Sequence, residues 1–132
     1  LMSLGQIKYG LFEFEIAQDY FTESIEYGVK CEDKRIQAIC NNELCNCFII
    51  KGDHIKAAQY SEKAIELAKE GQHLDILYFA ILSKGNIARM TGMFDEAIEC
   101  YVEILSNNLL IGYPDKTAEA YLNLSEIYNS LG

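Results

Sequence analysis

The side chains best suited to chemistry in this sequence are five cysteines and two histidines. Protein zinc sites usually show closely spaced cysteine pairs with histidine or further cysteine nearby. No CxxC pair occurs, and Cys45 and Cys47 would point to different sides of a helix, because two residues turn it by about 200°. We therefore interpret the cysteines as small, buried, reduced side chains rather than metal ligands or disulfides. The set is Cys31, Cys40, Cys45, Cys47 and Cys100.

The histidines do not predict catalysis either. His54 and His73 have no Ser, Cys or Asp partner in a recognised catalytic pattern. The sequence contains no HExxH motif and no glycine-rich phosphate loop. We expect no enzymatic activity and no cofactor.

Charge and hydropathy limit the classes of partner that the chain could bind. The net charge is −9, from 20 acidic and 11 basic residues, which argues against binding of a nucleic-acid backbone by this segment. Such a surface suits solubility, or a partner that is basic, neutral or peptide-like. No apolar stretch approaches the roughly 20 residues that cross a bilayer, so we expect a cytoplasmic protein with no membrane span. The opening residues LMSLGQIKYG are already helical in character, which is typical of a fragment cut from a longer protein.

An internal sequence repeat with a period of about 40 residues predicts the helices that position these side chains. Small, apolar and amide residues return at this step, with Lys84 as an exception in a leucine column. The agreeing sets are Gly52, Gly92 and Gly132; Ala17, Ala57 and Ala97; Leu4, Leu44 and Leu124; Ile25, Ile65 and Leu105; and Asn46 and Asn86.

Each repeat unit predicts two helices. In the second unit we expect helices over residues 33–51 and 54–70, the latter with one face of small residues that lets a neighbouring helix approach. Gly52 and Gly92 are expected at the turns, with positive φ, and Pro114 in the first turn of the last helix. No sustained period-2 pattern occurs, so we expect no sheet. A lone helix pair cannot bury both faces, and stacked copies can.

The order of these residues resembles the tetratricopeptide repeat. The second unit carries the pattern as Leu44, Cys45, Phe48, Gly52, Ala57, Ser61 and Ala64, and the third as Gly85, Ala88, Gly92, Phe94, Ala97, Tyr101 and Ile104. The resemblance implies an all-α, right-handed α–α superhelix of about seven helices in one domain over residues 1–132. The repeats would span about 1–32, 33–73, 74–113 and a half repeat 114–132. The period is longer than the family's usual period of about 34 residues. The first unit lacks a glycine at the turn position and has Gly10 slightly earlier.

In this family the first helix of each unit lines a concave groove, and the resemblance therefore implies a set of groove residues. Stacked Asn46 and Asn86 would hold a peptide main chain, since an amide both donates and accepts, or they are solvated surface residues. Arg89 would pair with a ligand carboxylate or with a neighbouring glutamate, and Phe79 would form a pocket wall or belong to the core. The main set is Asn42, Asn46, Phe79, Leu82, Asn86, Arg89, Leu122 and Glu126, flanked by Gln6, Tyr9, Ile39, Ile49, Glu119 and Asn129.

Two functions follow as hypotheses. In the first, the chain is a non-catalytic module that binds a protein or peptide segment in the groove of a larger bacterial regulator, whose longer repeats it resembles. In the second, it is a structural scaffold or self-association domain, with a homo-oligomer formed through the exposed last helix.

Overall fold

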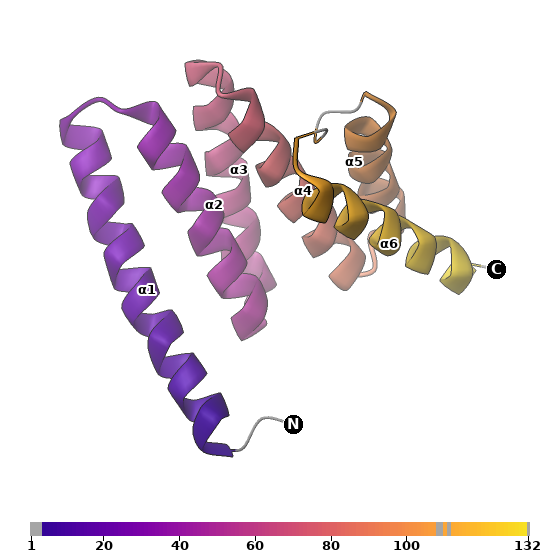
Figure 1. Cartoon of the computed structure of the whole chain (residues 1–132), viewed down its shortest axis with the longest axis horizontal. Helices are drawn as coiled ribbons and strands as arrows, with labels where there is room; N and C mark the ends of the chain where they lie inside the picture. Colours follow the sequence, from indigo (N-terminus) through magenta and orange to yellow (C-terminus); the bar gives the residue numbers. More distant parts are fainter. Residues whose placement is uncertain (1–3, 108–109, 111, 132) are drawn as a thin grey trace.

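The computed structural model describes the backbone of residues 4–107, 110 and 112–131, and the side chains of those residues from Glu13 onward. The described residues form six helices and no strand, which confirms the all-α prediction. The helices follow one another across the molecule from α1 at one end to α5 and α6 at the other (Figure 1). They are α1 (Leu4–Lys30), α2 (Lys34–Lys51), α3 (His54–Gly71), α4 (Leu74–Met90), α5 (Phe94–Ser106) and α6 (Pro114–Leu131).

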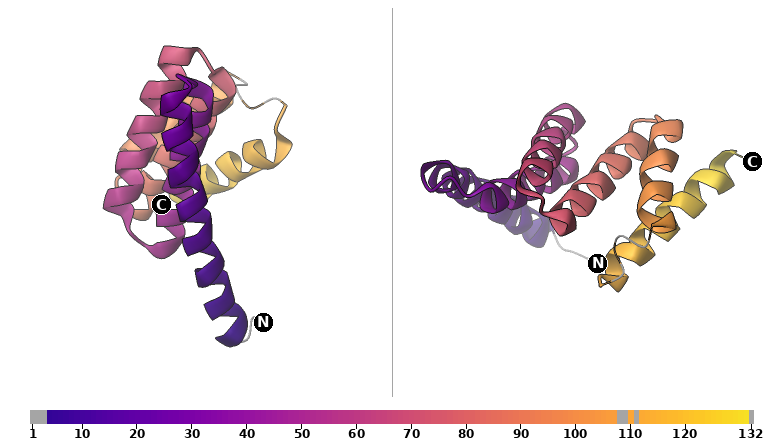
Figure 2. Two further views of the ribbon diagram at one scale, coloured as in Figure 1. Left: turned by 90° about the vertical axis from the view of Figure 1, so that its left-hand side faces the viewer. Right: turned by 90° about the horizontal axis from the view of Figure 1, so that it is seen from above.

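The prediction of seven helices is wrong by one. Residues 1–32 were expected to form a helix pair, but Leu4–Lys30 is a single helix of 27 residues. A reversal between helices needs a residue that adopts positive φ readily, and Phe12 stands where the later units have Gly52 and Gly92. Gly10 lies inside the helix and does not interrupt it. The N-terminal half of α1 consequently projects beyond the other helices (Figure 2).

The turns between helices recur at a regular spacing. Each of the four turns between α1 and α5 has one residue with positive φ. The predicted turn glycines Gly52 (84°) and Gly92 (81°) are confirmed among them, and the other two are Glu32 (55°) and Gln72 (58°). The N–H group of the next residue then bonds the carbonyl five positions back, an arrangement that satisfies the last carbonyls of the helix. These bonds are Asp33 to Gly28, Asp53 to Phe48, His73 to Ala68 and Met93 to Ala88, all at 2.8–2.9 Å.

The helix starts share this spacing. Helices α2 to α6 begin at residues 34, 54, 74, 94 and 114, and Pro114 takes the first helical position as predicted. The side chains of Asp33 and Asp53 accept hydrogen bonds from the backbone N–H groups of Ile36 and Lys56, which caps α2 and α3. The helices predicted over 33–51 and 54–70 therefore agree with the structure to within one residue.

The contacts between helices divide α2 to α6 into two sets. Each helix packs on the next, and α4 also contacts α2 and α6, whereas α3 and α5 make no close contact within the described residues. Small residues allow the close approach: Ala57 and Ala97 are fully buried, and a Cβ added to Gly85 would lie 3.0 Å from Cε1 of Tyr101. Helices α2, α4 and α6 thus form one side of the molecule, backed by α3 and α5.

None of the described helices combines the length and the apolar character that a bilayer crossing requires.

Candidate functional site

The side formed by α2, α4 and α6 carries a polar network that repeats along the chain. Ser83 Oγ on α4 lies 3.2 Å from Asn46 Oδ1 on α2, and Asn123 Nδ2 on α6 lies 2.8 Å from Asn86 Oδ1 on α4. Both pairs are separated by 37 residues, so the same inter-helix hydrogen bond is made in two successive units. In each pair the earlier asparagine oxygen accepts the bond.

Ser83 is shared among several acceptors. Its Oγ also lies 3.0 Å from Asn42 Oδ1 and 3.1 Å from the carbonyl of Phe79. A hydroxyl has one proton, so Ser83 donates to one of these oxygens at a time. Asn42, Ser83 and Asn123 are buried, whereas Asn46 and Asn86 are half-buried and reach solvent.

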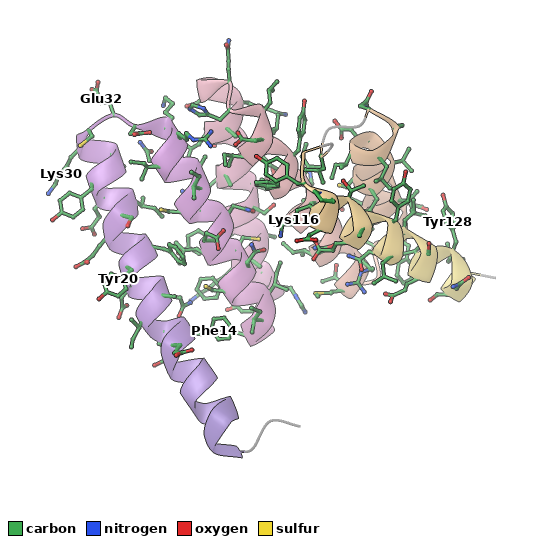
Figure 3. All side chains as sticks on the ribbon, in the orientation of Figure 1. Phe14, Tyr20, Lys30, Glu32, Lys116 and Tyr128 are labelled. Carbon is green, nitrogen blue, oxygen red and sulfur yellow. The ribbon has the colours of Figure 1, made fainter. Side chains whose placement is uncertain are left out.

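A cavity of about 240 Å³ lies beside the first of these bonds. Its walls come from all three helices, and Lys116 marks the α6 contribution in Figure 3. Four of the eight main predicted groove residues meet here: Asn42, Asn46, Phe79 and Leu82. The remaining walls are Glu43, Ser83, Lys116 and Glu119, so the cavity combines amides, apolar groups and both signs of charge.

Phe79 and Leu82 occupy this cavity differently. Phe79 is half-buried and its ring meets that of Tyr113 edge to face, with centroids 4.6 Å apart. Leu82 is only 2% exposed and belongs mainly to the core between α3 and α6. Phe79 is therefore the wall that a ligand side chain would touch.

The other predicted groove residues lie farther along α4 and α6. Asn86 Oδ1 accepts a second hydrogen bond, from the Tyr101 hydroxyl, and burial raises the pKa of that hydroxyl against the opposing effect of Arg89. Arg89 Nη1 lies 3.7 Å from Glu126 Oε2, which is the glutamate pairing that the sequence offered as an alternative. Leu122 is exposed on α6.

The residues predicted to flank the groove differ in their exposure. Ile39 and Ile49 are half-buried, Glu119 lines the cavity and Asn129 is exposed, whereas the side chains of Gln6 and Tyr9 lie outside the described residues.

Sequence reasoning missed Glu43, Ser83, Lys116 and Asn123. A signal for two of them was present, because Ser83 and Asn123 occupy equivalent positions of successive units, and Asn46 and Asn86 precede them at one common spacing. Lys116 gave no such signal, since Ile36 and Ile76 stand at its equivalent positions.

The cysteines are free, and one differs from the prediction. Cys40, Cys45, Cys47 and Cys100 are buried, but Cys31 is exposed because it lies in the turn after α1. Burial raises the pKa of Cys45 to about 12 and that of Cys100 to about 11, so both thiols stay protonated at neutral pH. Among the described residues no cluster of three or more His, Cys, Asp or Glu side chains is placed to hold a metal ion.

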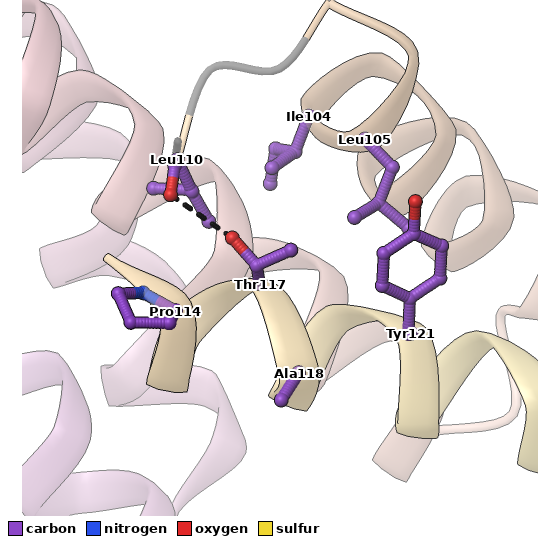
Figure 4. Close-up of a pocket in the computed structure, with 7 residues that line it drawn as sticks. All are labelled: Ile104, Leu105, Leu110, Pro114, Thr117, Ala118 and Tyr121. Atoms are coloured by element: carbon purple, nitrogen blue, oxygen red, sulfur yellow. Dashed lines mark hydrogen bonds between the residues drawn. The ribbon is translucent and has the colours of Figure 1, made fainter. Parts of the chain in front are cut away.

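A second cavity, of about 400 Å³, lies between α5 and α6 (Figure 4). It is lined mainly by Ile104, Leu105, Pro114 and Tyr121, and the Thr117 hydroxyl donates to the carbonyl of Leu110 at its edge. This cavity lies beside the half repeat and shares no residue with the polar network.

Comparison of the chain with protein-family models and with curated proteins found no match.

Proposed function

We propose that this chain is a tetratricopeptide-type right-handed α–α superhelix. We further propose that it acts as a non-catalytic module that binds an extended protein or peptide segment across α2, α4 and α6 within a larger bacterial regulator. The two-helix units, the regularly spaced turns and the contacts of α4 with both α2 and α6 support this architecture.

The observation that carries the function is the equivalence of Asn46 and Asn86. The Oδ1 atom of Asn86 accepts from Asn123 of the next unit, and the Oδ1 atom of Asn46 is one of the acceptors within reach of Ser83. No hydrogen bond from either Nδ2 group is found within the described part of the chain. The two amides therefore present donors at repeated positions, and backbone carbonyls of an extended segment also repeat along their length.

The cavity beside Asn46 supports the same proposal. Phe79 offers an apolar wall for a ligand side chain, and Glu43 and Glu119 favour a neutral or basic one. The net charge of −9 points to the same class of ligand.

The test is to remove the two donors without removing the acceptors that hold the helices together. A peptide is first selected from a pool of random, neutral, seven-residue peptides, so that the charge of an introduced carboxylate does not attract it. Asn46→Asp and Asn86→Asp keep the oxygens that accept from Ser83 and Asn123, so we expect the fold to survive. Each substitution should weaken the binding of the selected peptide about three- to tenfold, because each removes one hydrogen bond to the peptide. Fluorescence polarisation measures the affinity.

Asn107→Asp is the control, because it makes the same change of charge at an exposed position at the end of α5. It should leave the affinity unchanged. If all three variants bind the peptide equally well, the proposed role of Asn46 and Asn86 is wrong.

A second candidate function, self-association, is favoured by the outer sides of the terminal helices. Tyr121 and Tyr128 on α6 are 56% and 54% exposed, whereas Ile81 and Ala88 at the same positions of α4 are buried. On α1, Tyr20 is exposed on the side away from α2 (Figure 3). Light scattering over a concentration series tests this, and a strict monomer at all concentrations argues against it.

A further inference from the structure

Another cavity, of about 400 Å³, lies between α3, α4 and the start of α5. Ile55, Ile87 and Ala88 give it apolar walls, and its volume is in the range of small-molecule sites. Ile55 and Glu62, which also line it, are exposed, so the cavity is reachable from solvent. Its lining shares no residue with the proposed peptide groove.

The cavity lies where the repeat loses its aromatic residues. Three positions that are aromatic in two other units are not aromatic here, and all three of these residues line the cavity. They are His54 against Phe14 and Phe94, Ser61 against Phe21 and Tyr101, and Ala88 against Phe48 and Tyr128. The ring of Tyr101 is fully buried in the next unit, whereas the cavity at the equivalent Ser61 is open between α3 and α4.

Two buried polar atoms in this lining have no partner. Ser61 is 1% exposed, and neither its Oγ nor Nδ1 of His54 makes a hydrogen bond within the described residues. Buried polar groups are normally hydrogen-bonded, because leaving one unpaired costs its full desolvation penalty. A ligand with a hydroxyl or similar group would satisfy one of them.

Lys84 keeps one wall polar. It replaces the leucine found at positions 44 and 124, and its Nζ lies 3.3 Å from Glu62 on α3 and 3.9 Å from Glu96 on α5. Burial lowers the pKa of Lys84, but the hydrogen bond and charge of Glu62 outweigh that effect and raise it overall, so the ammonium stays charged. Ion pairs thus join α4 to α3 and to α5 at a position where other units place an apolar side chain.

We propose that this cavity binds a small aromatic molecule with a hydrogen-bonding substituent, its ring occupying the space left by the missing aromatic side chains and its substituent meeting Ser61 or His54. This site is separate from the peptide groove and does not depend on it.

The probe is p-cresol, whose ring and hydroxyl are those of a tyrosine side chain. In a titration followed by ¹H–¹⁵N NMR of the whole chain, we expect saturable shifts confined to α3, α4 and the start of α5. The dissociation constant should be about 1 mM or lower, which is ordinary for so small a ligand. Toluene, which lacks the hydroxyl, should bind at least about threefold more weakly. Absence of saturation, or shifts elsewhere, would overturn the proposal, and equal binding of toluene would overturn the role of the polar atoms.

Filling the cavity supplies the matched variants. Ser61→Tyr introduces the residue found at this position in the next unit and should weaken the binding of p-cresol at least tenfold. Ala88→Phe, which restores the aromatic of the preceding unit, should do the same and serves if Ser61→Tyr does not fold. Lys63→Tyr adds an aromatic at an exposed position of α3 outside the lining and should leave binding unchanged. Wild-type affinity in the folded filled variants would contradict the site.

Discussion

The hairpins α2–α3 and α4–α5 share one backbone design but differ inside. Both reverse at a glycine in the left-handed region, Gly52 and Gly92, and both use an asparagine to bond the following unit. Inside, Tyr101 of α5 is fully buried and donates to Asn86, whereas Ser61 at the equivalent position of α3 lines a cavity and makes no hydrogen bond within the described residues.

This difference separates two kinds of constraint. Turns and close helix contacts must recur in every unit, because stacking requires the same geometry each time. The interior positions need only be filled by a side chain or occupied by a ligand, so their residue types can differ between units. Asn46 and Asn86 agree between two units and belong to the proposed peptide groove, whereas Ser61 and Tyr101 differ and Ser61 lines the separate cavity.

The largest expected effect comes from giving the second hairpin the residue of the first. Tyr101→Ser removes a fully buried ring and should lower the free energy of unfolding by about 3–5 kcal/mol. Urea unfolding followed by circular dichroism measures it. Ser61→Ala is the control and should change stability by less than about 1 kcal/mol, because it removes no hydrogen bond. Equal costs for the two variants would mean that the interiors do not differ as described.

A smaller effect distinguishes the two classes of turn. Gly92→Ala forces a side chain into positive φ and should destabilise by about 1–2 kcal/mol, although a Cβ there would meet no neighbour within 4 Å. Gln72→Gly should do the opposite and stabilise by about 0.5 kcal/mol, because Gln72 already holds φ at 58°. Thermal unfolding measures both, and the same sign for the two variants would contradict the shared turn geometry.

The smallest effect concerns the ion pair between α2 and α4. Arg35 on α2 forms two hydrogen bonds to Asp75 on α4, at 3.1 and 2.9 Å, and this holds the pKa of Asp75 below its ordinary value. The pair's stabilisation is therefore fully present above the ordinary carboxyl pKa of about 4 and is lost as the pH falls through the lower folded value.

The expected result is a higher melting temperature for the wild type than for Asp75→Asn at pH 7, with the difference decreasing as the pH falls below the ordinary carboxyl pKa of about 4. Asp115→Asn is the control, because Asp115 is likewise the second residue of its helix and makes no ion pair among the described side chains. A pH-dependent loss of the same size for both variants would assign the effect to the helix ends instead.

The sequence predicted the features that repetition makes visible. Gly52, Gly92 and Pro114 act locally, so their roles follow from their types and positions. The small residues of α3 likewise predicted close packing, and Ala57, Ala64 and Ala68 are fully buried.

The remaining features depend on contacts between distant residues. The single long α1 follows from a missing turn residue near Phe12, a weak signal against the strong expectation of a pair. The bond from Asn123 to Asn86 and the cavity at Ser61 depend on which side chains face one another across helices. Lys84 stood out as an exception in the sequence, but only the structure pairs it with Glu62 and Glu96.

In the proposed function, Asn46 and Asn86 act together on one extended ligand. The most direct measurement follows their side-chain amide signals by NMR while the selected peptide is added. We expect both amide signals to shift on a single binding curve. Shifts of only one amide, or of α3 and α5 alone, would contradict it.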